Sequence, residues 1–373
     1  MEITEEPFGT LKDGRAAHLY TIANDHGAKL KVTDFGARVV SLFVPDKDGK
    51  PLDVILGYDD IDSYERDTKY MGAIAGRCAN RIARGELIVG TKSFALEKND
   101  HNRNHLHGGT TSGFDKKLWQ GEITEHGLVL TYVSPDGEGN YPGELTAKVT
   151  YALSNANEFI IRYEASATKD TVVNLSNHSY FNLDGAGTGP ALDEKVALFA
   201  SAYTPTDEYS IPDGRVLLVE GTPMDLRQGW PIGRQIDAEF SQLRWAGGYD
   251  HNWMIDEQPC AEEAKAKGLG QDATCPVDYA KPHMKKAAYA EAYDTGVTMT
   301  VYTTSPGLQF YTGNYLDAVL RGKGGAVYGP RAGFAMETQY PPDAVHNANF
   351  PQPFLKKGDV WQSVTVYVFG LKK

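Results

Sequence analysis

The stretch Leu145–Ala165, LTAKVTYALSNANEFIIRYEA, decides the fold class. Apolar side chains alternate with polar ones on both sides of a turn cluster, SNAN, at residues 154–157. Alternation with a period of two is typical of strands that bury one face, and two such runs joined by turn residues predict a β-hairpin. We therefore expect antiparallel β-structure at the centre of this chain.

Similar runs recur along the sequence. They lie at Lys29–Thr33, Arg38–Val44, Glu86–Leu96, Leu128–Val133, Val297–Thr303 and Val360–Gly370. Many short strands at regular spacing predict an all-β fold, here a large antiparallel β-sandwich with few short helices. One short helix is expected within Asp59–Asp67. We expect a single domain of residues 1–373, with a partly helical surface insertion at about 256–290, where apolar periodicity is weak.

Composition excludes several classes of partner. The net charge is −12 and the isoelectric point is near 5.3, whereas nucleic acids and anionic membranes require basic patches. The first ten residues, MEITEEPFGT, lack the basic and apolar regions of a signal peptide. No apolar run approaches the roughly 18 residues of a membrane span. We therefore expect a cytoplasmic protein that contacts neither nucleic acid nor membrane.

The cysteines indicate no disulfide framework. There are three, Cys78, Cys260 and Cys275, and none lies in a CxxC pair. A low, odd count is not typical of a disulfide-stapled fold, and without CxxC a structural zinc site is not expected. Whether Cys260 and Cys275 pair stays open at this stage.

The stretch TVVNLSNHSYFNLDG, Thr171–Gly185, begins like a strand and then becomes densely polar. A buried strand carries so many donors and acceptors only when each has a partner, and a ligand rich in hydroxyls would supply partners. The alternative is a polar strand end at the surface, in which His178 is hydrogen-bonded without a further role.

Other polar clusters add groups that could act on such a ligand. His105 and His107 lie two residues apart, which in a strand would place both on one face, as a metal site needs. The two glycines that follow favour instead a loop of close backbone approach, with His107 functional and His105 structural. Glu337 follows an apolar run, residues 333–336, where burial would raise its pKa and make it a better base near neutrality.

Seven motifs carry a resemblance to one family. They are GRCANRI at 76–82, HLHGG at 105–109, GFDKKLW at 113–119, NHSYFNL at 177–183, YDHNW at 249–253, PGLQFYTGN at 306–314 and FAMETQ at 334–339. In this set and order, the sequence resembles the aldose 1-epimerase (galactose mutarotase) family. The resemblance implies a mutarotase-type β-sandwich that needs no cofactor and no metal. It departs from the family's pattern at Cys78 and in the length of the segment 256–290.

The resemblance also implies an activity and site residues. The activity is interconversion of the α and β anomers of free aldohexoses, such as galactose and glucose, by acid/base ring opening and closure. His178 matches the general acid and Glu337 the general base. The family's substrate contacts match Asn80, Arg81, His107, Asp250 and Gln309. The sugar is the only partner implied, and the chain is expected to be a monomer or a homodimer.

Other classes of protein stay open at this point. A glycoside hydrolase needs two carboxylates about 5 Å or 6.5–9.5 Å apart, and Asp250 is the only other acid in the matched site set. A hexose-6-phosphate 1-epimerase would need several cations, whereas the motifs supply little beyond Arg77 and Arg81. A non-catalytic sugar-binding module has no need of a His/Glu pair. A metalloenzyme would use His105 and His107.

Overall fold

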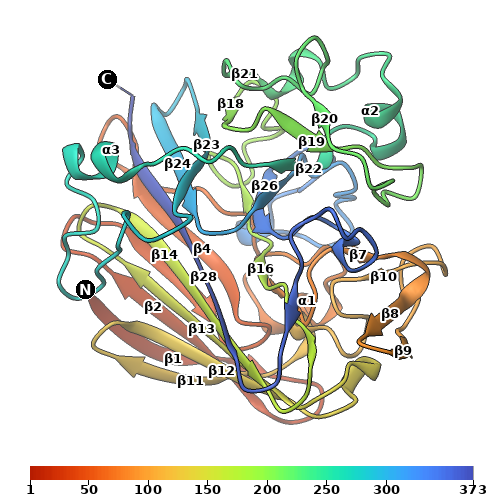
Figure 1. Ribbon diagram of the computed structural model, residues 1–373. Helices are drawn as coiled ribbons and strands as arrows, with labels where there is room; N and C mark the ends of the chain where they lie inside the picture. Colours follow the sequence, from red (N-terminus) through yellow and green to blue (C-terminus); the bar gives the residue numbers. More distant parts are fainter. Residues whose placement is uncertain (373) are drawn as a thin grey trace.

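The fold consists mainly of antiparallel sheets in the computed structural model, which describes residues 1–372 (Figure 1). The nine-stranded sheet has the order β11 (Gln120–Thr124), β12 (Gly127–Ser134), β13 (Leu145–Leu153), β14 (Glu158–Ala167), β28 (Val360–Leu371), β24 (Val297–Thr303), β23 (Lys285–Glu291), β18 (Lys195–Leu198) and β21 (Trp230–Pro231). The five-stranded sheet has the order β1 (Glu2–Thr10), β2 (Ala16–Ala23), β3 (Lys29–Thr33), β4 (Arg38–Pro45) and β5 (Pro51–Asp53).

A six-stranded sheet and several strand pairs complete the β-structure. The six-stranded sheet has the order β17 (Tyr180–Phe181), β26 (Phe334–Gln339), β25 (Gly307–Tyr311), β22 (Asp250–Met254), β19 (Ala202–Thr204) and β20 (Leu217–Leu218). The strand pairs are β7 (Arg81–Ile82) with β10 (His105–Leu106), β6 (Ile74–Ala75) with β16 (Ser176–Asn177), β15 (Thr171–Val172) with β27 (Phe354–Leu355), and β8 (Glu86–Val89) with β9 (Lys92–Ala95). The predicted all-β class is confirmed.

The hairpin that decided the fold class is formed as predicted. Strands β13 and β14 pair antiparallel from Leu145 opposite Ala167 to Leu153 opposite Phe159. Along β13 the apolar side chains at every second position are buried, while Lys148 between them is exposed. The pair occupies the middle of the nine-stranded sheet because both of its outer edges are also hydrogen-bonded, to β12 and β28.

One hydrophobic core contains residues from all three large sheets. Examples are Leu30 and Val39 from the five-stranded sheet, Val149 and Ile161 from the nine-stranded sheet, and Phe310 and Met336 from the six-stranded sheet. Burying each such side chain contributes about 1.5–3 kcal/mol. Two core tyrosines have paired hydroxyls: Tyr151 donates to the carbonyl of Ala37 at 2.6 Å and Tyr367 to that of Met336 at 2.9 Å. The sheets therefore pack as one sandwich.

Helices are short. The helix expected within Asp59–Asp67 is α1 (Ile61–Arg66), which begins after Asp60 because that side chain accepts a hydrogen bond from the Ser63 N–H at 2.7 Å. The others are α2 (Ser241–Ala246), α3 (Ala261–Ala266) and the 3₁₀ turns at Ala83–Gly85, Phe114–Lys116, Glu138–Asn140, Ile232–Arg234, Lys323–Gly325 and Ala344–His346. Within residues 1–372, no helix has the length and apolar character needed to cross a bilayer.

The segment 256–290 covers the outer face of the nine-stranded sheet and ends in β23. Side chains of that face alternate with those of the main core, and four of them, Ala152, Ile160, Tyr302 and Val366, contact apolar residues of the segment. The segment also donates to the buried carboxylate of Glu158, from the Tyr279 hydroxyl at 2.8 Å. Cys260 and Cys275 are both buried and free, so they do not pair. That the segment is an insertion stays a prediction.

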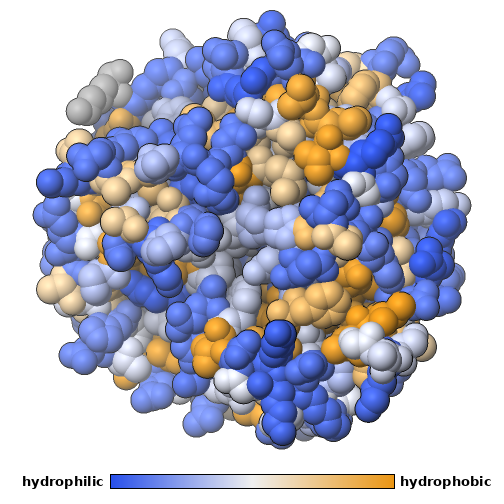
Figure 2. Space-filling view, viewed as in Figure 1, coloured by the Kyte–Doolittle hydropathy of each residue, from blue (hydrophilic) through white to orange (hydrophobic). Residues whose placement is uncertain are grey.

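The face of the molecule shown in Figure 2 is mostly hydrophilic, and its hydrophobic residues gather in small separate patches. In Figure 1, β22 and β26 of the six-stranded sheet lie near the centre, with β7 and β10 below them and to the right. The residues of the predicted site come from these strands and from the loops that flank them.

Candidate active site

One cavity of about 380 Å³ brings together most of the predicted site residues. It is lined by Asn80, Arg81, His107, His178, Asp250 and Glu337, which are far apart in sequence. Arg81 is the first residue of β7 and Asn80 immediately precedes it. His107 comes from the loop after β10, His178 from the turn between β16 and β17, Asp250 from the first position of β22 and Glu337 from the middle of β26. The topology therefore collects these motifs at one point.

His178 and Glu337 face each other in this cavity. The Nε2 atom of His178 lies 3.7 Å from Oε1 of Glu337, and both side chains are almost fully buried. Burial lowers the pKa of His178 to about 4. Burial also raises the pKa of Glu337 well above its usual range, and the nearby Asp250 carboxylate adds to that effect. Because both groups are buried, each favours its neutral form.

The tautomer of His107 is fixed by its neighbour. The backbone N–H of Asn80 donates to Nδ1 of His107 at 3.1 Å, so the ring proton sits on Nε2. Burial lowers the pKa of His107 well below its usual value, and His178 and Arg81 lower it further. The imidazole is therefore neutral. Its centroid lies 5.4 Å from that of His178, beside the acid/base pair.

This tautomer bears on metal binding. Ligand atoms of His107, His178 and Glu337 lie within 4.8 Å of one another. A metal at Nε2 of His107 would need the proton moved to Nδ1, where it would oppose the Asn80 N–H. His105 uses both ring nitrogens inside the protein, Nδ1 with the Glu97 carbonyl and Nε2 with the Tyr141 hydroxyl, each at 2.7 Å. His105 is therefore structural, as predicted, and the donor set does not fit a metal.

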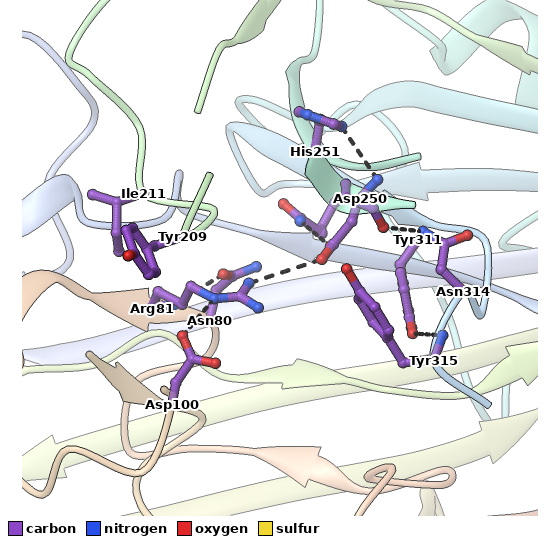
Figure 3. A network of polar contacts seen from close by, with 12 residues as sticks. Asn80, Arg81, Asp100, Tyr209, Ile211, Asp250, His251, Tyr311, Asn314 and Tyr315 are labelled. Atoms are coloured by element: carbon purple, nitrogen blue, oxygen red, sulfur yellow. Dashed lines mark hydrogen bonds and ion pairs between the residues drawn. The ribbon is translucent and has the colours of Figure 1, made fainter. Parts of the chain in front are cut away.

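Arg81 is held between two carboxylates (Figure 3). Its Nε lies 3.1 Å from Oδ2 of Asp100, and its Nη1 lies 3.9 Å from Oδ2 of Asp250. Gln309 donates from Nε2 to the other oxygen of Asp250 at 2.7 Å. Gln309 stands directly opposite Glu337 on the neighbouring strand, so both side chains lie on the same face of the sheet. It is not among the residues that line the cavity.

The double glycine after His107 marks a close backbone approach, as predicted. Gly108 has φ of +89°, and a Cβ there would lie 1.8 Å from the carbonyl oxygen of Gly76. Asn80 and His107 also have positive φ, at 63° and 50°. Strained backbone of this kind persists only where the surrounding structure fixes it. Here the close approach of Gly108 to Gly76 fixes the relative positions of the two loops that carry Asn80, Arg81 and His107.

Several cavity residues had no signal in the sequence. Tyr70, which has φ of +56°, places its ring 4.6 Å from that of His107. The loop beneath it is held by Arg38, which is fully buried and donates to Asp67 and to the Met71 carbonyl, each at 2.9 Å. Tyr180 and Tyr311, which lie within the motifs NHSYFNL and PGLQFYTGN, also line the cavity. Further lining residues without such a signal are Lys69, Asp100, Trp245 and Tyr315. These residues are close to the site in space but not in sequence, so one sequence alone does not reveal them.

Most polar groups of Thr171–Gly185 have protein partners. Asn174, Asn177 and Asn182 each donate to backbone carbonyls, at 2.9–3.4 Å. A ligand is therefore not needed to satisfy them, and His178 is the residue of this stretch that, with Tyr180, lines the cavity. Arg77 is equally internal, because it is buried and donates to the carbonyls of Pro142 and Gly143.

Comparison with known proteins gives a consistent result. A profile of the aldose 1-epimerase family matches residues 18–368. The chain belongs to the aldose 1-epimerase family. It is 38% identical over 372 residues to galactose mutarotase of Rattus norvegicus, covering 100% of this chain and 99% of the relative. It is 33% identical over 360 residues to aldose 1-epimerase of Escherichia coli, covering 96% of each.

Solved structures of the family agree. The galactose 1-epimerase of Lactobacillus acidophilus superposes with a TM-score of 0.81 at 26% identity, covering 100% of this chain and 99% of that one. A GalM/aldose epimerase homologue from C. elegans also gives 0.81, at 25% identity, covering 95% and 98%. The predicted family, mutarotase-type fold and enzyme class are thereby confirmed: the chain is an isomerase, an aldose 1-epimerase.

Proposed function

We propose that His178 and Glu337 interconvert the anomers of a free aldohexose, with galactose and glucose as substrates. The observation that carries this assignment is the buried pair itself, with 3.7 Å between Nε2 and Oε1. In a cyclic aldose, O1 and O5 are both bonded to C1. An acid and a base this close can therefore address the two oxygens of one hemiacetal at the same time.

The proton transfers follow from this placement. Glu337, as carboxylate, takes the proton of the C1 hydroxyl, while protonated His178 gives a proton to O5. The C1–O5 bond breaks, its electron pair stays on O5, and C1 becomes an aldehyde. Rotation about C1–C2 presents the other face of the carbonyl. Closure with the same two groups in reversed roles gives the other anomer. Each positioned acid or base contributes about 10²–10⁴ in rate.

The other cavity residues bind the sugar in this proposal. Neutral His107 presents its Nε2–H beside the pair and donates to the anomeric oxygen that becomes negative. Arg81 and Asp250 offer a donor and an acceptor to ring hydroxyls, and Asn80 lies next to Arg81 on the cavity wall. Gln309 orients Asp250 through the 2.7 Å hydrogen bond. Direct contact of Gln309 with the sugar stays a prediction.

The charge of the cavity favours a neutral sugar over a sugar phosphate. Arg81 and Lys69 line the cavity, but each has a carboxylate partner, Arg81 in Asp100 and Lys69 in Asp317 at 2.8 Å. Glu208 and Asp250 add negative charge to the same wall. A phosphate dianion would meet these carboxylates, and among residues 1–372 both cations of the cavity wall, Arg81 and Lys69, already have carboxylate partners. Galactose 6-phosphate should therefore be turned over far more slowly than galactose.

Polarimetry tests the assignment. Freshly dissolved α-D-galactose and α-D-glucose should reach their equilibrium rotation much faster with the wild-type protein. The Glu337→Gln variant should bind galactose with little change and lose about 10²–10⁴ in kcat, because the amide cannot take the proton. The matched control is Glu125→Gln, since Glu125 is 86% exposed and outside the cavity. A Glu337→Gln variant that is folded and turns over at near wild-type rate would remove Glu337 from this role.

The remaining classes predict other results. A glycoside hydrolase would release reducing sugar from a galactoside, and a sugar-binding module would bind galactose without changing its rotation. Neither outcome is expected, because Asp250 is already engaged by Gln309 and Arg81, and because a binding module has no use for a buried His/Glu pair.

A further inference from the structure

We propose that Asp343 and His346, which lie outside the cavity, are positioning residues that set Arg81 for sugar binding. The inference rests on the proposed function, because it assigns these two residues to the binding half of that site. Both belong to the turn that follows β26, in the stretch YPPDAVHNANFP at 340–351. Neither lines the cavity, so both act through Arg81.

Asp343 makes two hydrogen bonds with the backbone of residues 81–83. The backbone N–H of Asp343 donates to the carbonyl oxygen of Arg81 at 2.8 Å. Its side-chain Oδ1 accepts from the backbone N–H of Ala83 at 2.8 Å. Asp343 adopts φ of +54°, which a non-glycine residue takes only where its surroundings fix it. It therefore replaces a strand partner for residues 81–83, along the edge of β7 that β10 leaves unpaired.

The rest of Arg81 is fixed from other directions. Its backbone N–H donates to Oδ1 of Asn80 at 2.9 Å, and its strand pairs with β10 at Leu106. The guanidinium then extends toward Asp100 and Asp250 (Figure 3). A long, flexible side chain reaches a defined place only if its backbone is fixed, and Asp343 holds the carbonyl end of that residue.

His346 holds Asp343 in turn. Its Nδ1 lies 2.6 Å from Oδ1 of Asp343, the same oxygen that accepts from Ala83. The hydrogen bond to Asp343 raises the pKa of His346, burial opposes that rise, Arg84 lowers the pKa and Glu86 raises it. A protonated imidazole makes this a charge-assisted hydrogen bond, roughly twice as strong as a neutral one.

The turn also connects the two halves of the site. Asp343 follows Glu337 by six residues, and between them Tyr340 donates its N–H to Oδ1 of the buried Asn174 at 3.0 Å. The same short segment therefore carries the proposed base at one end and holds Arg81 at the other. Loosening its far end at Asp343 should affect sugar binding more than the chemistry at C1.

The chain offers a matched control pair. His18 and Asp34 are also joined side chain to side chain, Nδ1 to Oδ2 at 2.8 Å, and His18 donates its backbone N–H to the same carboxylate at 2.9 Å. Neither lines the cavity, and His18 belongs to β2 of the five-stranded sheet. Removing the His18 imidazole breaks a similar side-chain hydrogen bond to an aspartate without touching Arg81.

The test compares His346→Leu, His346→Asn and His18→Leu by polarimetry over a range of galactose concentrations. His346→Leu should raise KM for galactose about tenfold and leave kcat within about threefold, since uniform binding is lost and the chemical step is not. In His346→Asn the KM should return most of the way to the wild-type value, because the asparagine Nδ2 can donate to Asp343 in place of the histidine Nδ1. His18→Leu should lower the melting temperature and leave KM unchanged.

Several outcomes would overturn the inference. They are an unchanged KM in a folded His346→Leu, an equal rise of KM in His18→Leu, and a loss confined to kcat. If His346→Leu does not fold, Asp343→Asn gives the same reading, because it keeps both backbone contacts and weakens only the ion pair. An inactive wild type would refute the proposed function. An active wild type with a normal KM in His346→Leu would refute this inference alone.

Discussion

Replacing Gly108 by alanine should damage catalysis more than it damages the fold. A Cβ at this position would lie 1.8 Å from the carbonyl oxygen of Gly76, whereas real Cβ contacts are essentially never below 3.0 Å. The two loops must therefore separate by at least about 1.2 Å. One of them carries His107 and the other leads to Asn80 and Arg81.

The magnitude can be divided into two parts. Gly108 has φ of +89°, and a left-handed conformation costs alanine about 1–2 kcal/mol in stability. Moving a positioned group by about 1 Å costs on the order of 10²-fold in rate. Gly137 provides the control, because it has φ of +84° but nothing within 4 Å of its added Cβ. Gly137→Ala should therefore show the conformational cost without the displacement.

The assay is thermal unfolding together with polarimetry on galactose for both variants. Gly137→Ala should lose a few degrees in melting temperature and keep its kcat. Gly108→Ala should lose more stability and about 10² in kcat. If the two variants have equal kcat, the close approach of the loops does not position His107, and the reasoning from the Gly76 carbonyl is wrong.

Two further predictions concern the acid/base pair and the outer face of the sheet. The reaction needs one and only one transferable proton on the pair of His178 and Glu337. The value of kcat/KM should therefore fall below about pH 4, where protonation of His178 gives the pair a second proton. It should fall again above the raised pKa of Glu337, where the pair has lost its proton. A pH profile by polarimetry checks this, and an acid limb near the ordinary histidine pKa of about 6.5 would contradict it. Tyr279→Phe removes a hydrogen bond to buried Glu158 and should lower stability by about 1.5–3 kcal/mol in denaturant unfolding, with galactose kinetics unchanged. Altered kinetics there would mean that the segment 256–290 reaches the site.

The strands could be predicted from the sequence because their signal is local. Alternation over nine or ten residues fixes which face of β13 and β14 is buried, and the run Lys29–Thr33 is strand β3 residue for residue. The predicted run Glu86–Leu96 proves to be two short strands, β8 and β9, around a turn at Gly90 and Thr91. Positive φ at Gly90 permits that turn, and an alternating pattern does not reveal it.

The site could be predicted only in part, for a different reason. Residues within the seven family motifs, such as His178 and Glu337, meet in the cavity as expected. Tyr70 and Asp100 lie in loops without periodicity, and they reach the cavity because Arg38 and Arg81 hold them there through long-range contacts. The same applies to Asn174, Asn177 and Asn182, whose partners are backbone carbonyls from other segments. Side-chain composition shows what needs a partner, and only the fold shows which partner it has.

The protonation of the buried pair has a consequence for the reaction. Burial favours neutral His178 and protonated Glu337 when no sugar is bound. In the proposed mechanism, ring opening moves one proton from O1 to Glu337 and another from His178 to O5. The pair therefore becomes neutral at the moment when the aldehyde forms. The buried cavity thus stabilises the proton state of the open-chain intermediate and disfavours the ion pair that accompanies the cyclic sugar. Forming the ion pair beside the cyclic sugar therefore costs free energy, and ring opening returns that free energy as both groups become neutral again.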